Sequence, residues 1–258
     1  MFTSAFRMAM TAGFTPRSLD PLVWLDGADS SSLYDATSGG SLVSADGIIA
    51  RWQDKSGNSN HLTQATSGAR PTRRVGVKNG ADIVRFNGAN ELNTASNVLF
   101  ASCPAITHFI VMNLSTPGII IESSPNFNLT VGAFITSSDT GNVFGSAFKH
   151  SAGYATCAEV TGSTNAWHNW ATMMNPTLAI DEVSFFRDGN TPAVTRTFNS
   201  DTTTSFISER LFLGARSGGL IPATGDIAEV LIYPRALSVS ERQSVERYLS
   251  AKWGIPIA

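Results

Sequence analysis

Carboxylates are the side chains of this sequence best suited to chemistry. Two pairs lie close enough in sequence for their members to act together. In glycoside hydrolysis, one carboxylate of such a pair is the acid and the other is the nucleophile. Asp181 and Glu182 are adjacent, so on a strand they point to opposite faces. Asp226 and Glu229 are three residues apart and should also diverge. The spacing therefore predicts no catalytic pair and a protein that is not an enzyme.

Histidines offer no catalytic or zinc-binding pattern either. The four histidines are His61, His108, His150 and His168, and none has the spacing of a helical zinc motif. His168 follows Trp167 with no serine or cysteine motif beside it. We expect a packed, hydrogen-bonded histidine there, and we expect no cofactor.

Calcium is the one metal for which the sequence offers ligands. Hard oxygen atoms occur on a small set of neighbouring side chains: Asp26, Asp29, Asp54, Asn58 and Asn60. Their spacing matches no diagnostic calcium loop, and hydrogen bonds within turns explain them equally well. The basic run Arg70, Arg73, Arg74 and Lys78 is more typical of a solvated connection than of an anion site.

The composition favours a single domain built of strands and turns. The chain has 258 residues, of which 42% are hydrophobic and only 15% charged, and it contains 22 glycines. Its net charge of -2 gives no reason to expect nucleic acid as a partner. No apolar run approaches the length of a membrane-spanning helix, and the N-terminus lacks the apolar core of an export signal.

Residues 20–233 read as strands separated by turns. Leu129, Val131, Ala133 and Ile135 alternate as in a half-buried strand, while 106–114 and 119–121 are apolar enough to be covered on both faces. We expect six large side chains to fill the gap between two sheets: Trp24, Trp52, Phe86, Phe185, Phe212 and Tyr233. Cys103 and Cys157 could pair only if the fold brings them together, and two free core thiols are the simpler expectation.

The C-terminal residues predict one helix over about 238–253. Ser238 and Glu241 have the spacing of a capping box. Val245, Leu249 and Trp253 form an apolar stripe, and Gly254 suits a left-handed cap. Arg242 and Glu246 have the spacing of an i,i+4 ion pair. We expect this helix to close the edge of the sandwich as a lid.

Residues 1–19 form a separate apolar segment before the first expected strand. Phe2, Phe6, Met10 and Phe14 recur every four positions, as on one face of a short helix. We interpret the segment as an assembly arm that binds a neighbouring subunit. The alternative is that it folds back over its own sandwich.

Three stretches resemble the laminin-G-like, concanavalin A-like jelly rolls. The first is LVWLDGADSSSLYD with RWQDKSGNSNHLTQATSGARPT and NGADIVRFNG, the second joins Trp167-His168 to Phe186-Arg187-Asp188-Gly189, and the third is LFLGAR with GDIAEVLIYPRALSVSERQSVERYLSAKWG. They cover residues 20–254 and imply a two-sheet antiparallel jelly roll at 20–258. Glucanases of this fold carry E-x-D-x-E or E-x-D-x-x-E strands, which this sequence lacks.

The opening of the chain also resembles jelly-roll proteins found among the structural proteins of tailed bacteriophages. This resemblance implies a non-catalytic virion component, in a decoration, tail or fibre, with other virion proteins and further copies of itself as partners. Lectin-like attachment to a host-surface glycan would suit that setting. The alternative is a bacterial carbohydrate-binding module of a secreted or surface protein. In neither case do we expect insertion into a membrane.

Overall fold

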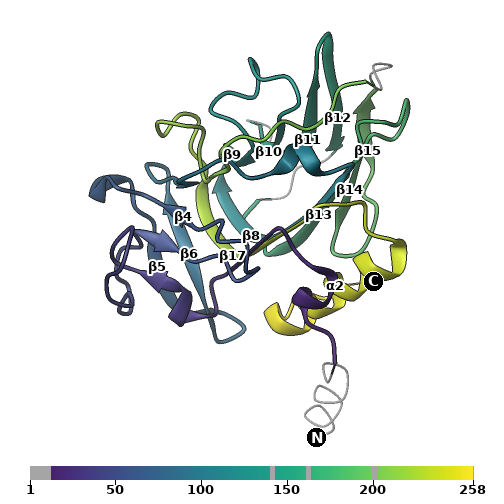
Figure 1. Ribbon diagram of the computed structural model, residues 1–258. Coiled ribbons are helices and arrows are strands. Elements are labelled where there is room, and N and C mark those ends of the chain that lie inside the picture. The colour runs from purple at the N-terminus through teal and green to yellow at the C-terminus, as the bar shows by residue number, and fades with distance from the viewer. Residues whose placement is uncertain (1–12, 140–142, 161–163, 199–202, 258) are drawn as a thin grey trace, which may run out of the picture.

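The computed structural model describes residues 13–139, 143–160, 164–198 and 203–257. Two antiparallel sheets face each other, and one helix covers the outer face of the first sheet (Figure 1). The predicted two-sheet jelly-roll architecture is therefore confirmed. No helix within the described ranges is long and apolar enough to cross a membrane.

The first sheet has seven strands in the order β14-β13-β8-β17-β6-β5, with β1 also pairing with β17. Their bounds are β1 Val23–Asp26, β5 Thr72–Lys78, β6 Ala81–Asn87, β8 Ile106–Thr116, β13 His168–Met174, β14 Val183–Arg187 and β17 Thr224–Tyr233. The long central strands β8 and β17 run side by side, and β8 is apolar because both of its faces are covered.

The second sheet has ten strands in the order β15-β12-β11-β10-β9-β16-β7-β4-β3-β2. Their bounds are β2 Leu33–Tyr34, β3 Arg51–Trp52, β4 Leu62–Thr63, β7 Leu92–Thr94, β9 Ile119–Glu122, β10 Phe134–Ser138, β11 Phe144–His150, β12 Gly153–Glu159, β15 Val194–Thr197 and β16 Phe212–Leu213. The predicted strand across Leu129 and Val131 is wrong. Both side chains lie in an exposed turn before β10, where their alternation matches no sheet face.

The main core lies between the sheets and holds Trp52, Phe86 and Phe185 as predicted. Three other aromatics lie elsewhere. Trp24 and Tyr233 pack in a second cluster on the outer face of the seven-stranded sheet, and Phe212 lies between Asn93 and Glu122 on neighbouring strands. The prediction assumed one apolar layer, whereas the helix creates a second. Cys103 and Cys157 are buried free thiols, as expected.

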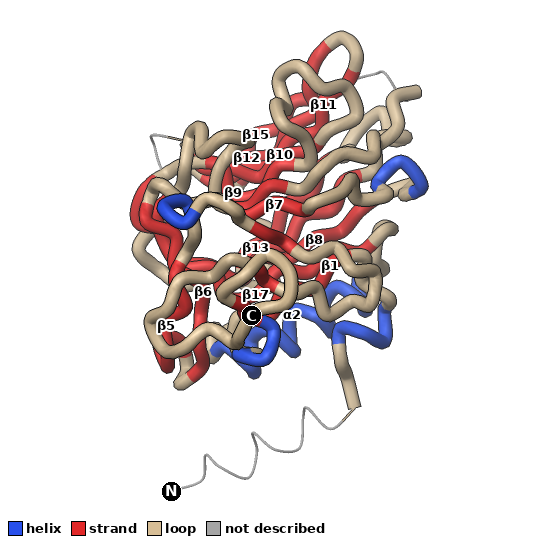
Figure 2. The backbone as a smooth tube through the Cα atoms, turned by 60° about the vertical axis from the view of Figure 1, so that its left-hand side comes forward, coloured by secondary structure: helices blue, strands red, loops and turns tan. Residues whose placement is uncertain are grey.

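The helix α2 (Val239–Trp253) begins at the predicted capping box and ends at Gly254 in the left-handed conformation. Val245, Leu249 and Trp253 are fully buried against Phe109 and Leu231 of β8 and β17. The helix therefore covers the face of the sheet and not its edge, and Figure 2 shows it beneath β17 and β8. An edge position would leave the outward apolar residues of the two central strands in water.

The chain packs on this outer layer before the predicted domain boundary at residue 20. Phe14 contacts Tyr248 of α2, with 6.2 Å between ring centroids, and Leu19 joins the same apolar cluster. Tyr233 donates a hydrogen bond to the carbonyl of Pro16. Residues 14–19 thus belong to the sandwich, contrary to the arm predicted over 1–19. Phe2, Phe6 and Met10 lie outside the described residues.

Candidate binding grooves

The predicted calcium ligands lie close together, but lysines and backbone groups occupy their oxygens. The Lys55 ammonium lies 2.8 Å from a carboxylate oxygen of Asp26 and 2.8 Å from one of Asp29. Lys252 contacts the other Asp26 oxygen at 2.6 Å. A cation between Asp26 and Asp29 would have to displace an ammonium group that already balances their charge.

Asp54, Asn58 and Asn60 hold the turn after β3 in place. The Asp54 carboxylate accepts hydrogen bonds from the backbone N–H groups of Trp24, Ser56 and Asn60, each at 2.9 Å. The Asn58 and Asn60 amides donate to backbone carbonyls in 21–22. The turn-capping interpretation therefore accounts for these contacts. Among the described residues, no group of three or more His, Cys, Asp and Glu side chains could hold a metal ion.

The carboxylate pairs considered for hydrolysis do not open onto a groove. Asp226 is held by Arg85, and Glu229 is buried beneath α2. Their expected divergence is wrong, since a β-bulge at Ala228 turns both to the outer face of the sheet. Asp181 pairs with Arg196 at the surface, while Glu182 is buried against His150.

His168 is hydrogen-bonded, as expected. Its Nδ1 lies 2.5 Å from a carboxylate oxygen of Asp188, in the turn between β14 and β15. The other Asp188 oxygen accepts the Asn169 backbone N–H at 2.9 Å. These contacts fasten the turn to β13.

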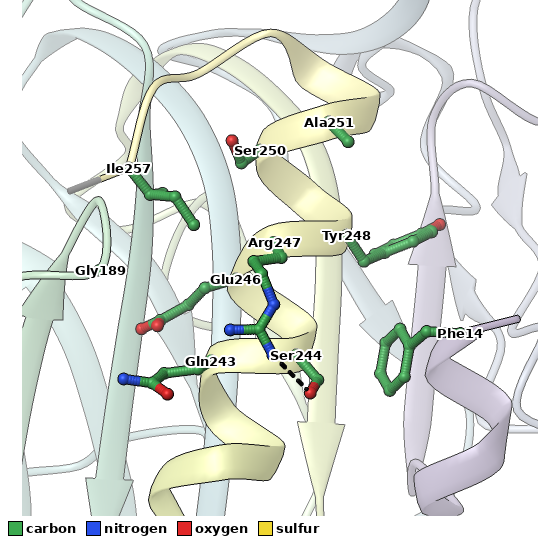
Figure 3. Close-up of a pocket in the computed structure, with 10 residues that line it drawn as sticks. All are labelled: Phe14, Gly189, Gln243, Ser244, Glu246, Arg247, Tyr248, Ser250, Ala251 and Ile257. Atoms are coloured by element: carbon green, nitrogen blue, oxygen red, sulfur yellow. Dashed lines mark hydrogen bonds between the residues drawn. The ribbon is translucent and has the colours of Figure 1, made fainter. Parts of the chain in front are cut away.

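A cavity of about 560 Å³ runs over the exposed side of α2. We call it the helix groove (Figure 3). Phe14 and Tyr248 line one side, while Gly189 and Ile257 lie on the other. Of its polar residues, Arg247 donates to Ser244 at 3.0 Å, and Glu246 pairs with Arg242 on the same helix. Size alone does not make this groove a site for a polar ligand.

A second depression lies on the outer face of the ten-stranded sheet, above β3, β4 and β7. Two adjoining cavities of about 140 and 420 Å³ share Thr37, Thr63 and Ala95. We call them together the polar groove. Their remaining lining residues are Arg51, Ser59, Asn60, His61, Gln64, Ala65, Asn93, Thr94, Ser96 and Arg210. Hydroxyl, amide, imidazole and guanidinium groups therefore surround one space, and no acidic residue lines it within the described ranges.

Strand register explains how these side chains converge. Arg51, Thr63 and Asn93 are direct partners on β3, β4 and β7, so their side chains share one face. Leu62 and Leu92, their neighbours in sequence, point into the core. The Arg51 guanidinium stacks 4.1 Å from the centroid of the Tyr34 ring on β2. The sheet thus sets a row of polar groups at fixed spacing.

His61 is held as a neutral hydrogen-bond donor. Its Nδ1 accepts the backbone N–H of Asp54 at 3.1 Å, so the ring proton resides on Nε2. Partial burial lowers the pKa of His61, and the nearby Arg51 charge lowers it further, against the opposing effect of Asp54. Among the described residues we find no partner for Nε2–H, which leaves this donor available to a ligand.

Of the predicted calcium ligands, only Asn60 lines the polar groove, and of the four histidines only His61 does. The other lining residues come from separate parts of the chain, 37–65, 93–96 and Arg210, and no sequence motif joins them. The only feature of the sequence that could have indicated this groove is the set of polar side chains within or just after the short strands β3, β4 and β7.

Comparison with known proteins agrees with this architecture. The profile of the Laminin_G_3 family, described as the concanavalin A-like lectin/glucanases superfamily, matches residues 110–241, about half of the chain. No curated protein sequence matches it.

Two solved structures illustrate the range of similar folds. The binding domain of botulinum neurotoxin serotype D aligns with a TM-score of 0.59 and 12% identity, over 94% of this chain and 56% of that one. A GH54 α-L-arabinofuranosidase aligns with a TM-score of 0.55 and 14% identity, over 93% of this chain and 66% of that one. This chain thus spans less than two thirds of either, and the likeness concerns the fold alone.

Proposed function

Because the chain belongs to the concanavalin A-like lectin/glucanases superfamily, we propose that it is a non-catalytic carbohydrate-binding protein that uses the polar groove. The observation that carries the proposal is the groove's lining. Thr37, Ser59, Thr63, His61 and Arg51 line one cavity of the groove, and Arg210 lines the adjoining one. A saccharide is rich in hydroxyl groups and requires many directional donors and acceptors in one place.

The positions of the carboxylates support a binding role over a hydrolytic one. Hydrolysis of a glycosidic bond requires two carboxyl groups that both reach the sugar. Glu229 is 1% exposed, Glu182 is also 1% exposed, and Asp226 is engaged by Arg85. None of the three lines the polar groove.

Filling each groove in turn tests the proposal. Ala95 and Ala251 are exposed residues that line the polar and helix grooves respectively, so a tryptophan at either removes no core contact. We expect Ala95→Trp to abolish binding to an array of immobilised glycans, and Ala251→Trp to leave it unchanged. Equal binding by both variants, or no binding by the unmodified protein, would contradict the proposal.

We further propose a setting for this binding, a virion component of a tailed bacteriophage that attaches to host-surface glycans. The specific support is the helix groove, where Phe14 contacts Tyr248. Phe14 follows the apolar residues Phe2, Phe6 and Met10 in sequence. A neighbouring subunit that buried those residues would gain roughly 25 cal/mol for each Å² removed from water. A carbohydrate-binding module of a secreted or surface protein, by contrast, needs no such assembly contact.

Assembly distinguishes these two settings. The virion setting predicts that the purified protein forms oligomers or joins a particle in many copies, measured by light scattering and electron microscopy. A protein that stays monomeric at all concentrations yet binds glycans would favour the carbohydrate-binding module.

A further inference from the structure

The distribution of ion pairs sets the polar groove apart from the rest of the surface. Eight arginines in the described ranges form ion pairs with carboxylates: Arg73, Arg74, Arg85, Arg187, Arg196, Arg216, Arg235 and Arg242. Five others have no carboxylate partner among the described residues: Arg17, Arg51, Arg70, Arg210 and Arg247. Three of these, Arg51, Arg70 and Arg210, lie at or beside the polar groove, whereas Arg247 lines the helix groove. Three guanidinium groups without a carboxylate partner are therefore gathered at one place.

Backbone and amide oxygens orient these guanidinium groups but do not neutralise them. Arg51 donates to the Gly39 carbonyl at 3.1 Å. Arg210 donates to the Thr94 carbonyl at 2.7 Å and to the Asn93 amide oxygen. Arg70 donates to the carbonyl oxygens of residues 35, 64 and 65. Each side chain is thus fixed in place while its full charge remains.

Arg51 and Arg210 lie on opposite sides of Thr63. Arg51 is on β3, and Arg210 is bonded to Asn93 on β7, two strands away. Adjacent strands lie about 4.8 Å apart, so the backbones of β3 and β7 are about 10 Å apart. The Arg51 guanidinium stacks on Tyr34 of β2, on the other side of β3 from Thr63. This arrangement allows two contacts with one bound oligosaccharide.

The carboxylates near the groove are bonded to backbone or amide groups, and no ion pair joins them to these three guanidinium groups. Glu91 lies behind Gln64, is buried, and accepts the Gly219 backbone N–H at 2.8 Å. Asp54 lies behind His61, and its oxygens accept several backbone hydrogen bonds. Asp35 is exposed beside Thr37 and accepts the Ser41 backbone N–H at 2.8 Å.

We propose that the polar groove selects anionic saccharides, whose carboxylate or sulfate groups bind between Arg51 and Arg210. This inference rests on the proposed carbohydrate-binding function and names its ligand class. Arginine matches both anions because its planar fork donates two parallel hydrogen bonds to a pair of oxygens. The His61 Nε2–H and the hydroxyl groups of the groove would bind the sugar ring itself.

The test uses pairs of probes that differ only in charge. Oligogalacturonate is compared with its methyl ester, and sulfated dextran oligosaccharides with neutral dextran, together with an array that holds acidic and neutral glycans. We expect acidic glycans to dominate the array hits and at least one charged probe to bind tenfold more tightly than its neutral counterpart. Binding should weaken as salt increases. The stronger of the two pairs distinguishes carboxylate from sulfate as the preferred anion.

Variants locate the effect. Arg51→Gln and Arg210→Gln should each weaken binding of the acidic hits about tenfold, equivalent to about 1.4 kcal/mol. Arg247→Gln, which changes an exposed arginine in the helix groove, should have no effect. Thermal melting shows whether Arg210→Gln, which also loses its contacts with β7, remains folded, and Arg51→Gln tests the site independently.

The outcomes separate the two proposals. The array hits could be neutral glycans whose binding is weakened by Ala95→Trp but not by Arg51→Gln. This result would overturn the anionic preference and leave the carbohydrate-binding proposal intact. An array without any hit would overturn both.

Discussion

Glu229 is the residue on which the helix and sheet meet. Its carboxylate accepts hydrogen bonds from Trp24 Nε1 at 2.8 Å, Trp253 Nε1 at 2.7 Å and Tyr248 Oη at 3.1 Å. Lys252 Nζ lies 2.8 Å away. Burial raises the pKa of Glu229, while Lys252 opposes that effect. Donors from β1 and α2 thus converge on one buried charge of β17, so the contact has a defined geometry.

Replacing this carboxylate should be costly. In Glu229→Gln, the amide nitrogen cannot accept the indole hydrogen bond, and Lys252 loses a partner at a buried position. We expect a loss of about 3 kcal/mol in the free energy of unfolding, measured by urea denaturation at neutral pH. Asp46→Asn, which weakens the exposed Arg74 pair, is the control and should cost less than about 1 kcal/mol. Equal losses of unfolding free energy in the two variants would show that the hydrogen bonds to Glu229 stabilise the fold no more than an exposed ion pair does.

Glu241 predicts how the protein responds to acid. Its side chain pairs with Arg235 and accepts the Ser238 backbone N–H, which together lower the pKa of Glu241 to about 2. A lowered folded-state pKa adds stability above the ordinary value of 4.5, and that stability disappears as pH falls from 4.5 towards 2. Melting temperatures between pH 6 and pH 2 should therefore fall less for Glu241→Gln than for the unmodified protein. Melting temperatures that fall equally with pH in both proteins would contradict the lowered pKa of Glu241.

Side-chain roles were predictable where they depend on neighbours in sequence. Asp54 bonds the turn that follows it, and Ser238 and Glu241 cap one helix, because both interactions span a few residues. The directions of Asp226 and Glu229 were not predictable. One extra residue, Ala228, reverses the alternation of β17, and the sequence carries no mark of that bulge.

In the helix α2, too, local features were predictable from the sequence and long-range packing was not. Its bounds follow from local caps and an apolar stripe, and the structure confirms them. Its position on the face of the sheet depends on Trp24, Ile83 and Phe109, which are far away in sequence. The polar groove was beyond prediction for the same reason, since common polar residues from distant segments converge only through strand register.

Trp253 measures how firmly the helix is docked. The side chain is fully buried, so its removal leaves a cavity. Glu229 also loses the hydrogen bond that Trp253 Nε1 donates. We expect Trp253→Ala to cost about 4 kcal/mol and to lower the melting temperature by about 10 °C. Val239→Ala, at an exposed position of the same helix, should change the melting temperature little. A melting temperature unchanged by Trp253→Ala would show that the helix does not stabilise the fold.

The molecule has three layers, with the two candidate grooves on opposite sides. The polar groove lies on the outer face of the ten-stranded sheet, and the helix groove lies on α2 beyond the other sheet. A saccharide and a neighbouring subunit could therefore bind at the same time. This separation suits a subunit that assembles through one side and attaches through the other.

Two truncations test the assembly side of this arrangement. Removing residues 2–12 deletes Phe2, Phe6 and Met10 but keeps Phe14, whose ring packs on Tyr248. If the deleted residues bind a neighbouring subunit, the melting temperature of the monomer should not change, and oligomers should disappear from light scattering. Removing residues 2–15 also takes Phe14 from the apolar cluster beneath it, so the monomer should melt at a lower temperature. A shorter truncation that melts lower while it associates normally would show that residues 2–12 cover their own sandwich. In that case the helix groove would be an intramolecular contact and the assembly proposal would fail.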